Sequence, residues 1–169
     1  HVPIEFIAIM EREHMISMVD FTMLREACEL IQIWKPVWPH IVLNVNFSRN
    51  TLTEPDYLER VDEILAETGA NPAQLIFEIT ESSQGIQLES MSSLLTELQK
   101  RGIVIAIDDL GTEAACLEML YLPQISMAKI DKSLINKAEH SEREQLVIRH
   151  LVDLCHDLYG RLYDAERSL

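Results

Sequence analysis

The chain has few of the residues that mark special protein classes. Its 169 residues include only 3 cysteines, 5 glycines and 6 prolines, and aromatic residues make up 6%. So little glycine and proline excludes a collagen-like or low-complexity chain. The cysteines, Cys28, Cys116 and Cys155, are far apart among apolar residues at helical spacing, so we interpret them as reduced core residues of a cytosolic protein. No apolar run approaches the roughly 20 residues of a membrane-spanning helix.

Basic residues are also scarce. The chain has 14 Lys and Arg against 28 Asp and Glu, a net charge of -14. This balance argues against duplex nucleic acid and anionic membranes as general partners, and we expect an acidic chain that binds a phosphate compound to use metal cations. Hydrophobic residues make up 47% of the chain, enough for one buried core. We therefore expect a single domain over residues 1–169.

Helical and strand-like patterns alternate along the chain. Apolar spacing predicts helices over residues 3–15, 20–34, 54–68, 88–101, 113–121 and 142–159. Short β-branched runs predict strands over residues 41–45, 75–79, 103–107, 127–130 and, more weakly, 161–163. These runs are continuously apolar rather than alternating, which is typical of strands buried on both faces of a parallel sheet. The expected fold class is therefore α/β.

Each of the first four apolar runs leads into a polar residue. These residues are Asn46, Glu78, Asp108 and Lys129, and the first three follow one another at about 30 residues, the length of one β–α–β unit. Because parallel strands end at the same edge of a sheet or barrel, we expect the four side chains to meet there. A polar residue after a strand is also a common helix cap, and Ser48 and Asp109 are the best candidates for that simpler role.

Oxygen ligands without cysteine or histidine favour Mg²⁺ or Mn²⁺ over zinc. Two such ions about 3.5 to 4 Å apart, shared by Asp108 and Asp109, would stabilise the attacking and leaving oxygens of a phosphodiester cleavage. Lys129 would then hold the attacking water or offset charge on phosphorus. The sequence thus predicts a two-metal phosphodiesterase site.

Several motifs occur in a family-specific order. They are PIEFIAIMERE, VNFS, EITES, IAIDDLGT and LPQISMAKIDKSLI, and the similarity that they carry extends over nearly the whole chain. In this order and spacing the sequence resembles the EAL-domain family of bacterial cyclic-di-GMP phosphodiesterases. The resemblance implies a TIM-like (β/α) barrel that uses two Mg²⁺ or Mn²⁺ ions to hydrolyse cyclic di-GMP to linear pGpG.

The resemblance also assigns roles to individual residues. It implies four metal ligands, Asn46, Glu78, Asp108 and Asp109. Lys129 resembles the lysine that contacts the attacking water, and Glu81 resembles the glutamate that anchors the loop after the paired aspartates. Cyclic di-GMP is the expected partner, with an accessory GGDEF or sensor domain in the full-length protein and a homodimer left open. We expect a cytoplasmic domain, free or as the cytosolic part of a membrane-anchored protein, that does not itself contact the membrane.

Three departures from the family pattern matter. The glutamate that names the family precedes the first residue here, the loop after Asp109 differs from the family's DDFGTGYSSL, and no AEGVE motif follows Tyr163. We therefore expect an incomplete barrel that lacks the first strand and the C-terminal strand or strands. The alternative function is a degenerate EAL domain that binds cyclic di-GMP as a receptor, or an interaction module whose partner surface includes Trp34 and Trp38.

Overall fold

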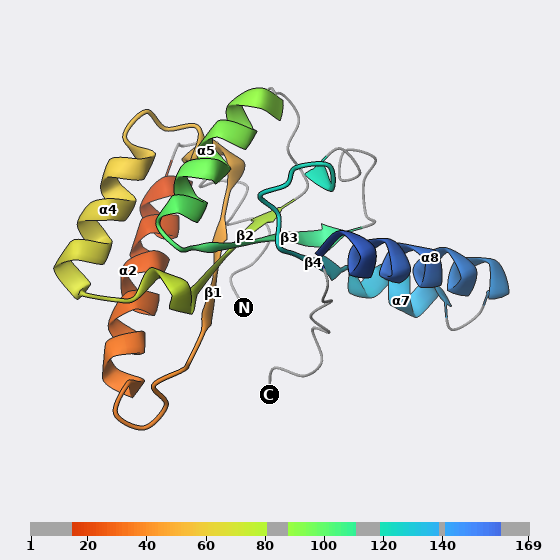
Figure 1. Ribbon diagram of the computed structural model, residues 1–169, viewed down its shortest axis with the longest axis horizontal. Helices are drawn as coiled ribbons and strands as arrows, with labels where there is room; N and C mark the ends of the chain where they lie inside the picture. The colour runs from red at the N-terminus through yellow and green to blue at the C-terminus, as the bar shows by residue number, and fades with distance from the viewer. Residues whose placement is uncertain (1–14, 81–87, 111–118, 139–140, 160–169) are drawn as a thin grey trace.

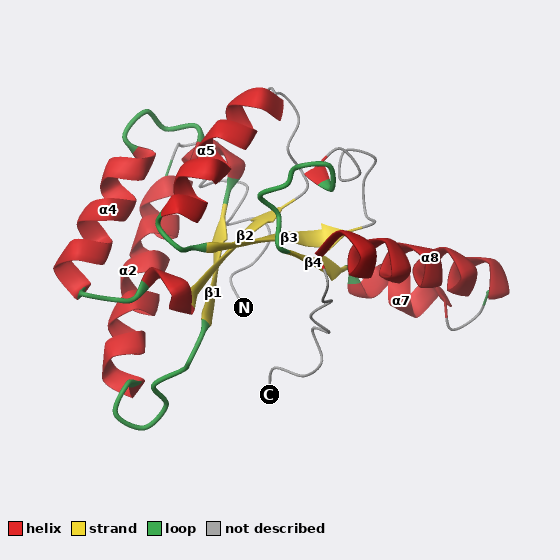
Figure 2. Cartoon of the chain, viewed as in Figure 1, coloured by secondary structure: helices red, strands yellow, loops and turns green. Residues whose placement is uncertain are grey.

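The computed structural model describes residues 15–80, 88–110, 119–138 and 141–159. Four strands form one sheet: β1 (Leu43–Phe47), β2 (Leu75–Thr80), β3 (Val104–Leu110) and β4 (Met127–Ile130). The strand order is β1-β2-β3-β4, and each strand runs parallel to the next. Over the described residues the sheet is open at both edges (Figure 2), which agrees with the expected α/β fold and an incomplete barrel.

Helices connect the strands and cover the sheet. The longer ones are α2 (Ile16–Trp34), α4 (Tyr57–Thr68), α5 (Leu88–Lys100), α7 (Lys132–Ala138) and α8 (Glu142–Tyr159). Figure 1 shows α2, α4 and α5 grouped on one side of the sheet, while α7 and α8 lie side by side next to β4. Two short turns of helix, α3 (Arg49–Leu52) and η1 (Pro72–Gln74), lie at opposite ends of α4. None of these helices is long and apolar enough to cross a bilayer.

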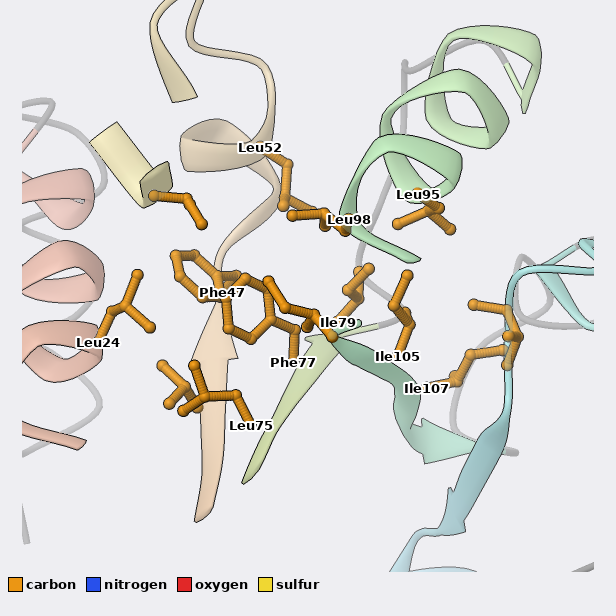
Figure 3. Close-up of a cluster of buried hydrophobic side chains, with 14 of the residues drawn as sticks. Leu24, Phe47, Leu52, Leu75, Phe77, Ile79, Leu95, Leu98, Ile105 and Ile107 are labelled. Atoms are coloured by element: carbon orange, nitrogen blue, oxygen red, sulfur yellow. The ribbon is translucent and has the colours of Figure 1, made fainter. Parts of the chain in front are cut away.

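The core lies between the sheet and the group of helices formed by α2, α4 and α5. Alternate residues of the first three strands point into it and are buried: Val45, Phe47, Leu75, Phe77, Ile79, Ile105 and Ile107. Leu24, Leu95 and Leu98 approach from the helices (Figure 3). Cys28 and Cys155 are buried free thiols, as expected, and Cys116 lies outside the described residues. Burial on this scale is the main driving force for folding.

Several predicted boundaries were wrong. The helix expected from Asp20 begins one turn earlier, at Ile16, and Asp20 is buried within it. The strand expected over residues 41–45 is displaced to Leu43–Phe47, and the one expected over 103–107 continues to Leu110, because both strands extend through their polar residues. Helices α3 and α7 were not predicted, because four and seven residues are too short for a clear helical period.

The remaining predicted elements agree with the structure or lie outside it. Helix α8 and strand β4 have the predicted bounds, β2 and α5 differ by one residue, and α4 begins three residues after the predicted start at Glu54. Gly69 ends α4 in a left-handed conformation with φ 66°, which a residue without a side chain adopts at no steric cost. The helix over 3–15 and the strand over 161–163 fall outside the described residues, as does most of the helix over 113–121.

Candidate functional site

Glu78 is the buried charge at the centre of the sheet. It lies on β2, opposite Asn46 of β1 and Ala106 of β3, and only 2% of its surface is exposed. Side chains of directly paired strand residues share one face, so Glu78 points away from Phe77 and Ile79, which face the helices. A carboxylate buried this deeply requires polar partners, because isolating its charge from water is costly.

Lys129 supplies the cationic partner from β4. Its Nζ lies 2.9 Å from Oε2 of Glu78 and 3.1 Å from Oδ1 of Asp108, so one ammonium bridges two carboxylates. Ala106 lies between Glu78 and β4 in the strand register, and its methyl group leaves room for the long lysine side chain to cross β3. Three strands therefore contribute one charged side chain each to a single cluster.

The pKa of Lys129 reflects this environment. Burial alone lowers the pKa of the ammonium, but the hydrogen bonds to Glu78 and Asp108 outweigh that effect and raise the pKa above the ordinary value for lysine. Lys129 is therefore a stable cation at neutral pH. Together with the two carboxylates it leaves a local net charge of about -1 when both acids are ionised.

Asp108 and Asp109 lie where β3 becomes irregular. The pairing of β3 with β4 shifts between Ile107 and Leu110, and Asp109 adopts a left-handed backbone with φ 58°. The backbone N–H of Asp109 donates to Oδ1 of Asp108 at 3.0 Å. Asp109 is exposed, whereas Asp108 is half-buried. The irregularity breaks the alternation of the strand, so the two neighbouring aspartates are not on strictly opposite faces of a regular strand.

Two asparagines of β1 lie on the same face of the sheet as Glu78. Asn46 is the predicted ligand and is directly opposite Glu78 in the register, while Asn44, two residues earlier, donates a hydrogen bond from Nδ2 to Oε1 of Glu78. Both asparagines are exposed. Asn44 was missed by the sequence reasoning, although the period of two along a strand places it on the same face as Asn46.

A second polar cluster fixes the end of β1. The carboxylate of Asp20, buried on α2, accepts hydrogen bonds through Oδ2 from the backbone N–H of Ser48 at 2.8 Å and from Oγ1 of Thr51 at 2.5 Å. Ser48 is the N-cap of α3, as the simpler interpretation of the sequence predicted, and its Oγ accepts from the N–H of Thr51. Helix α2 is therefore hydrogen-bonded to Ser48, two residues beyond Asn46.

The predicted site residues have different outcomes. Lys129 contacts both Glu78 and Asp108, and Asn46 lies opposite Glu78 in the register. Asp109 adjoins the cluster through its backbone hydrogen bond to Asp108. Glu81 lies outside the described residues. The side chains from β2, β3 and β4 therefore meet, whereas Asn46 of β1 is placed next to Glu78 by the strand register.

The donor atoms suit a hard divalent cation. Carboxylate oxygens from Glu78 and Asp108 and amide oxygens from Asn46 are the ligand types preferred by Mg²⁺ and Mn²⁺. Within residues 15–80, 88–110, 119–138 and 141–159 there is, however, no group of three or more acidic, histidine or cysteine side chains placed to hold an ion. The described residues fit such a cation as a pair of carboxylates with neighbouring amides, with Lys129 between the two acids.

Comparison with known proteins places this arrangement in context. The family model of the EAL domain matches residues 2–161. An uncharacterized signaling protein of Caulobacter vibrioides is 31% identical over 153 residues, which is 90% of this chain and 18% of that protein. The chain therefore spans less than a fifth of the length of this relative.

Solved structures of other proteins have a similar fold. The PaMucR phosphodiesterase in complex with c-di-GMP matches with a TM-score of 0.85 and 26% identity, covering 95% of this chain and 65% of that one. The Klebsiella pneumoniae BlrP1 manganese and cy-diGMP complex has the same fold, with a TM-score of 0.78 and 24% identity over 95% of this chain and 40% of that one. The sheet and its helices are thus those of a known (β/α) architecture.

Proposed function

Because the chain belongs to the EAL domain family, we propose that it is part of a metal-dependent phosphodiesterase that hydrolyses cyclic di-GMP to linear pGpG in bacterial second-messenger signalling. The observation that supports this most is the meeting of Glu78, Asp108 and Lys129 at one face of a parallel sheet, each from a different strand. A cluster of opposite charges in which one acid is almost fully buried is typical of active sites rather than of surface ion pairs.

Asn46, Glu78, Asp108 and Asp109 are the proposed metal ligands, with Mg²⁺ or Mn²⁺ as the ion. A divalent cation at such a site supplies electrostatic stabilisation of the charge that develops on a phosphodiester during cleavage. The solved PaMucR phosphodiesterase contains c-di-GMP, and the BlrP1 complex contains manganese as well, which supports the choice of ligand and metal. The net charge of -14 opposes the binding of an anionic dinucleotide, and bound cations would offset that repulsion.

The protein's own residues perform three tasks in this proposal. The buried Glu78 and the half-buried Asp108 provide negative charge that water screens less than it would on the surface. Lys129, a cation with a raised pKa, offsets the repulsion between the two acids and offers its N–H donors to a water molecule or to a phosphate oxygen. Glu81 would anchor the loop after the paired aspartates.

Hydrolysis of cyclic di-GMP tests the proposal directly. The purified protein is incubated with cyclic di-GMP and Mg²⁺ or Mn²⁺, and linear pGpG is quantified by chromatography. We expect turnover that chelation abolishes and that Asp108→Asn lowers by about 100-fold or more, the scale of losing one electrostatic contact to a transition state. The matched control is Asp153→Asn, at an exposed position of α8, which should leave the rate unchanged.

The second candidate function is a receptor that binds cyclic di-GMP without cleaving it. It is favoured by the contact of Lys129 with both carboxylates, which already gives Glu78 and Asp108 a cationic partner, and by the altered loop after Asp109. Calorimetry separates the two functions. Micromolar binding with no pGpG would support the receptor, and the absence of any binding would reject both.

An interaction module was the third possibility in the sequence. Trp34 and Trp38 stack on each other with ring centroids 5.1 Å apart and are 40% and 58% exposed, so they are surface residues rather than core. Exposure of two stacked tryptophans is compatible with a partner surface. The exposed tryptophan pair identifies no partner, and we retain the phosphodiesterase as the proposed function.

A further inference from the structure

The hydrogen bond between Asn44 and Glu78 points to a positioning residue outside the predicted ligand set. We propose that Asn44 holds the carboxylate of Glu78 in the orientation that binds a divalent cation, an inference that rests on the proposed metal-dependent function. Asn44 donates from Nδ2 to Oε1 of Glu78, and Lys129 donates from Nζ to Oε2. Among the described residues each oxygen of Glu78 therefore has one donor, and the two donors come from β1 and β4, the outer strands of the described sheet.

The remaining acceptor capacity of Glu78 makes this arrangement suitable for a cation. A carboxylate offers about four lone-pair positions, and the two hydrogen bonds use one on each oxygen. The carboxylate plane is thus fixed while a lone pair on each oxygen stays available. Loss of a partner that orients a metal ligand in this way typically weakens metal binding by about 10- to 100-fold.

Asn44 and Lys129 differ in how they respond to a cation. The ammonium of Lys129 carries a positive charge, so a divalent ion at Glu78 repels it. The amide of Asn44 is neutral, so its hydrogen bond to Oε1 is not opposed in this way. Asn44 is therefore the contact that can hold Glu78 in place both with and without an ion.

The strand geometry explains why position 44 serves this purpose. Glu78 is opposite Asn46 in the register, and Asn44 is two residues closer to the start of β1 on the same face. The side chain of Glu78 extends back along β1 to reach Asn44, which leaves Asn46 free of that role. Asn44 is exposed, so its replacement by alanine removes a donor without creating a cavity in the core.

The affinity for Mn²⁺ alone, measured by calorimetry or electron paramagnetic resonance, tests this inference independently of catalysis. Asn44→Ala should weaken Mn²⁺ binding by about tenfold, the lower end of the effect of removing an orienting partner. Asn136→Ala, at an exposed position of α7, is the matched control and should bind Mn²⁺ like the parent protein. An unchanged Mn²⁺ affinity in folded Asn44→Ala overturns the inference, whatever happens to its melting temperature.

A double-mutant cycle shows whether Asn44 acts through Glu78. In the background of Glu78→Met, Asn44→Ala should have no further effect on Mn²⁺ affinity, because there is no carboxylate to orient. An equal effect in both backgrounds would contradict the inference. If Glu78→Met does not fold, the Mn²⁺ affinities of Asn44→Ala and Asn136→Ala still support or overturn the inference.

The outcome for catalysis is read separately. In an active protein, Asn44→Ala should lower kcat with little change in KM, because the dinucleotide does not depend on Asn44 for contact. If the parent protein binds Mn²⁺ but does not hydrolyse cyclic di-GMP, the proposed function fails while the Mn²⁺ measurements still support or reject the role of Asn44. If the parent protein does not bind Mn²⁺, both proposals are overturned.

Discussion

The two faces of the same parallel sheet differ sharply in chemistry. The face toward α2, α4 and α5, which we call the packed face, carries buried apolar side chains such as Phe47, Phe77 and Ile105. The opposite face, which we call the polar face, carries Asn44, Asn46, Glu78, Asp108 and Lys129. Successive residues of one strand belong to different faces. Stability and function are therefore encoded side by side, and substitutions can separate them.

The largest expected effect is on the packed face. Phe77 is fully buried, and its ring centroid lies 4.5 Å from that of Phe47, so Phe77→Ala should lower the free energy of unfolding by about 3–5 kcal/mol. Denaturant unfolding measures the loss, and Ile33→Ala on the exposed side of α2 serves as the control. The Mn²⁺ affinity of the folded fraction should not change. A loss below about 1 kcal/mol would contradict the comparison between the faces.

The next largest effect comes from the cation on the polar face. Lys129→Met removes the charge that separates Glu78 and Asp108 and keeps most of the side-chain volume. In the presence of a chelator we expect a loss of about 2 kcal/mol, less than for a fully buried pair because Lys129 is partly exposed. Thermal denaturation with and without Mn²⁺ checks this, and Mn²⁺ should stabilise the variant more than the parent protein.

The sign of the pH dependence follows from the raised pKa of Lys129. A group whose pKa is higher in the folded state contributes its full stabilisation below the unfolded value, about 10.4 for lysine, and loses it as the pH rises through the folded value. The difference between parent and Lys129→Met should therefore persist from neutral pH to about pH 10 and shrink above it. A difference that grows above pH 10 would show that Lys129 does not stabilise as a cation.

A smaller effect is expected at Asp20, whose carboxylate joins α2 to the residues that follow β1. Asp20→Ala leaves the N–H of Ser48 and the hydroxyl of Thr51 without their carboxylate acceptor, and should cost about 1–2 kcal/mol. Asp20→Asn keeps an acceptor oxygen and should cost less, which separates hydrogen bonding from charge. Equilibrium unfolding of both variants is the measurement. Equal losses would mean that the charge of Asp20 matters more than its acceptor oxygen.

The smallest effect is expected at an ion pair away from both faces. Arg101 donates from Nε to Oδ1 of Asp62 at 2.6 Å and from Nη2 to Oδ2 at 2.7 Å, and these hydrogen bonds lower the pKa of Asp62 below its ordinary value. Asp62 is half-exposed, so Arg101→Gln should cost less than about 1 kcal/mol.

Acid and salt test that ion pair. A lowered carboxyl pKa means that the stabilisation is present above the unfolded value, about 3.9, and is lost as the pH falls through the lower folded value. The difference between Arg101→Gln and the parent protein should therefore vanish below about pH 3 and shrink in molar salt. A difference that survives both conditions would indicate packing of the arginine stem rather than charge.

The sequence predicted the succession of elements better than their ends. Helix α8 was placed correctly because its apolar period is clear, and β4 has the predicted bounds although Lys129 interrupts its short apolar run. Strand β3 was predicted to end before Asp108, yet it continues through Asp109 to Leu110. Polar residues at the end of a strand remain part of it when their backbone groups are hydrogen-bonded. Asp20 lies within α2 and not at its start, and its carboxylate accepts a hydrogen bond from Ser48 on a distant segment, which the local sequence does not show.

Part of the candidate site was predictable from the sequence. Glu78, Asp108 and Lys129 were expected to meet because parallel strands align their ends, and they do. Asn44 was not expected, because nothing in its local sequence distinguishes it from an ordinary exposed strand residue. Its significance depends on the face and register that it shares with Glu78.

The sequence by itself determined the alternation of strands and helices, the parallel sheet, the family resemblance and the acidic character of the chain. These properties depend on local periodicity and composition. Only the tertiary structure decided that Lys129 bridges two acids, that Asn44 orients one of them, and that Asp20 anchors the end of β1. Those contacts join residues far apart in the chain, and they depend on strand register and helix placement, which the packing of the whole domain sets.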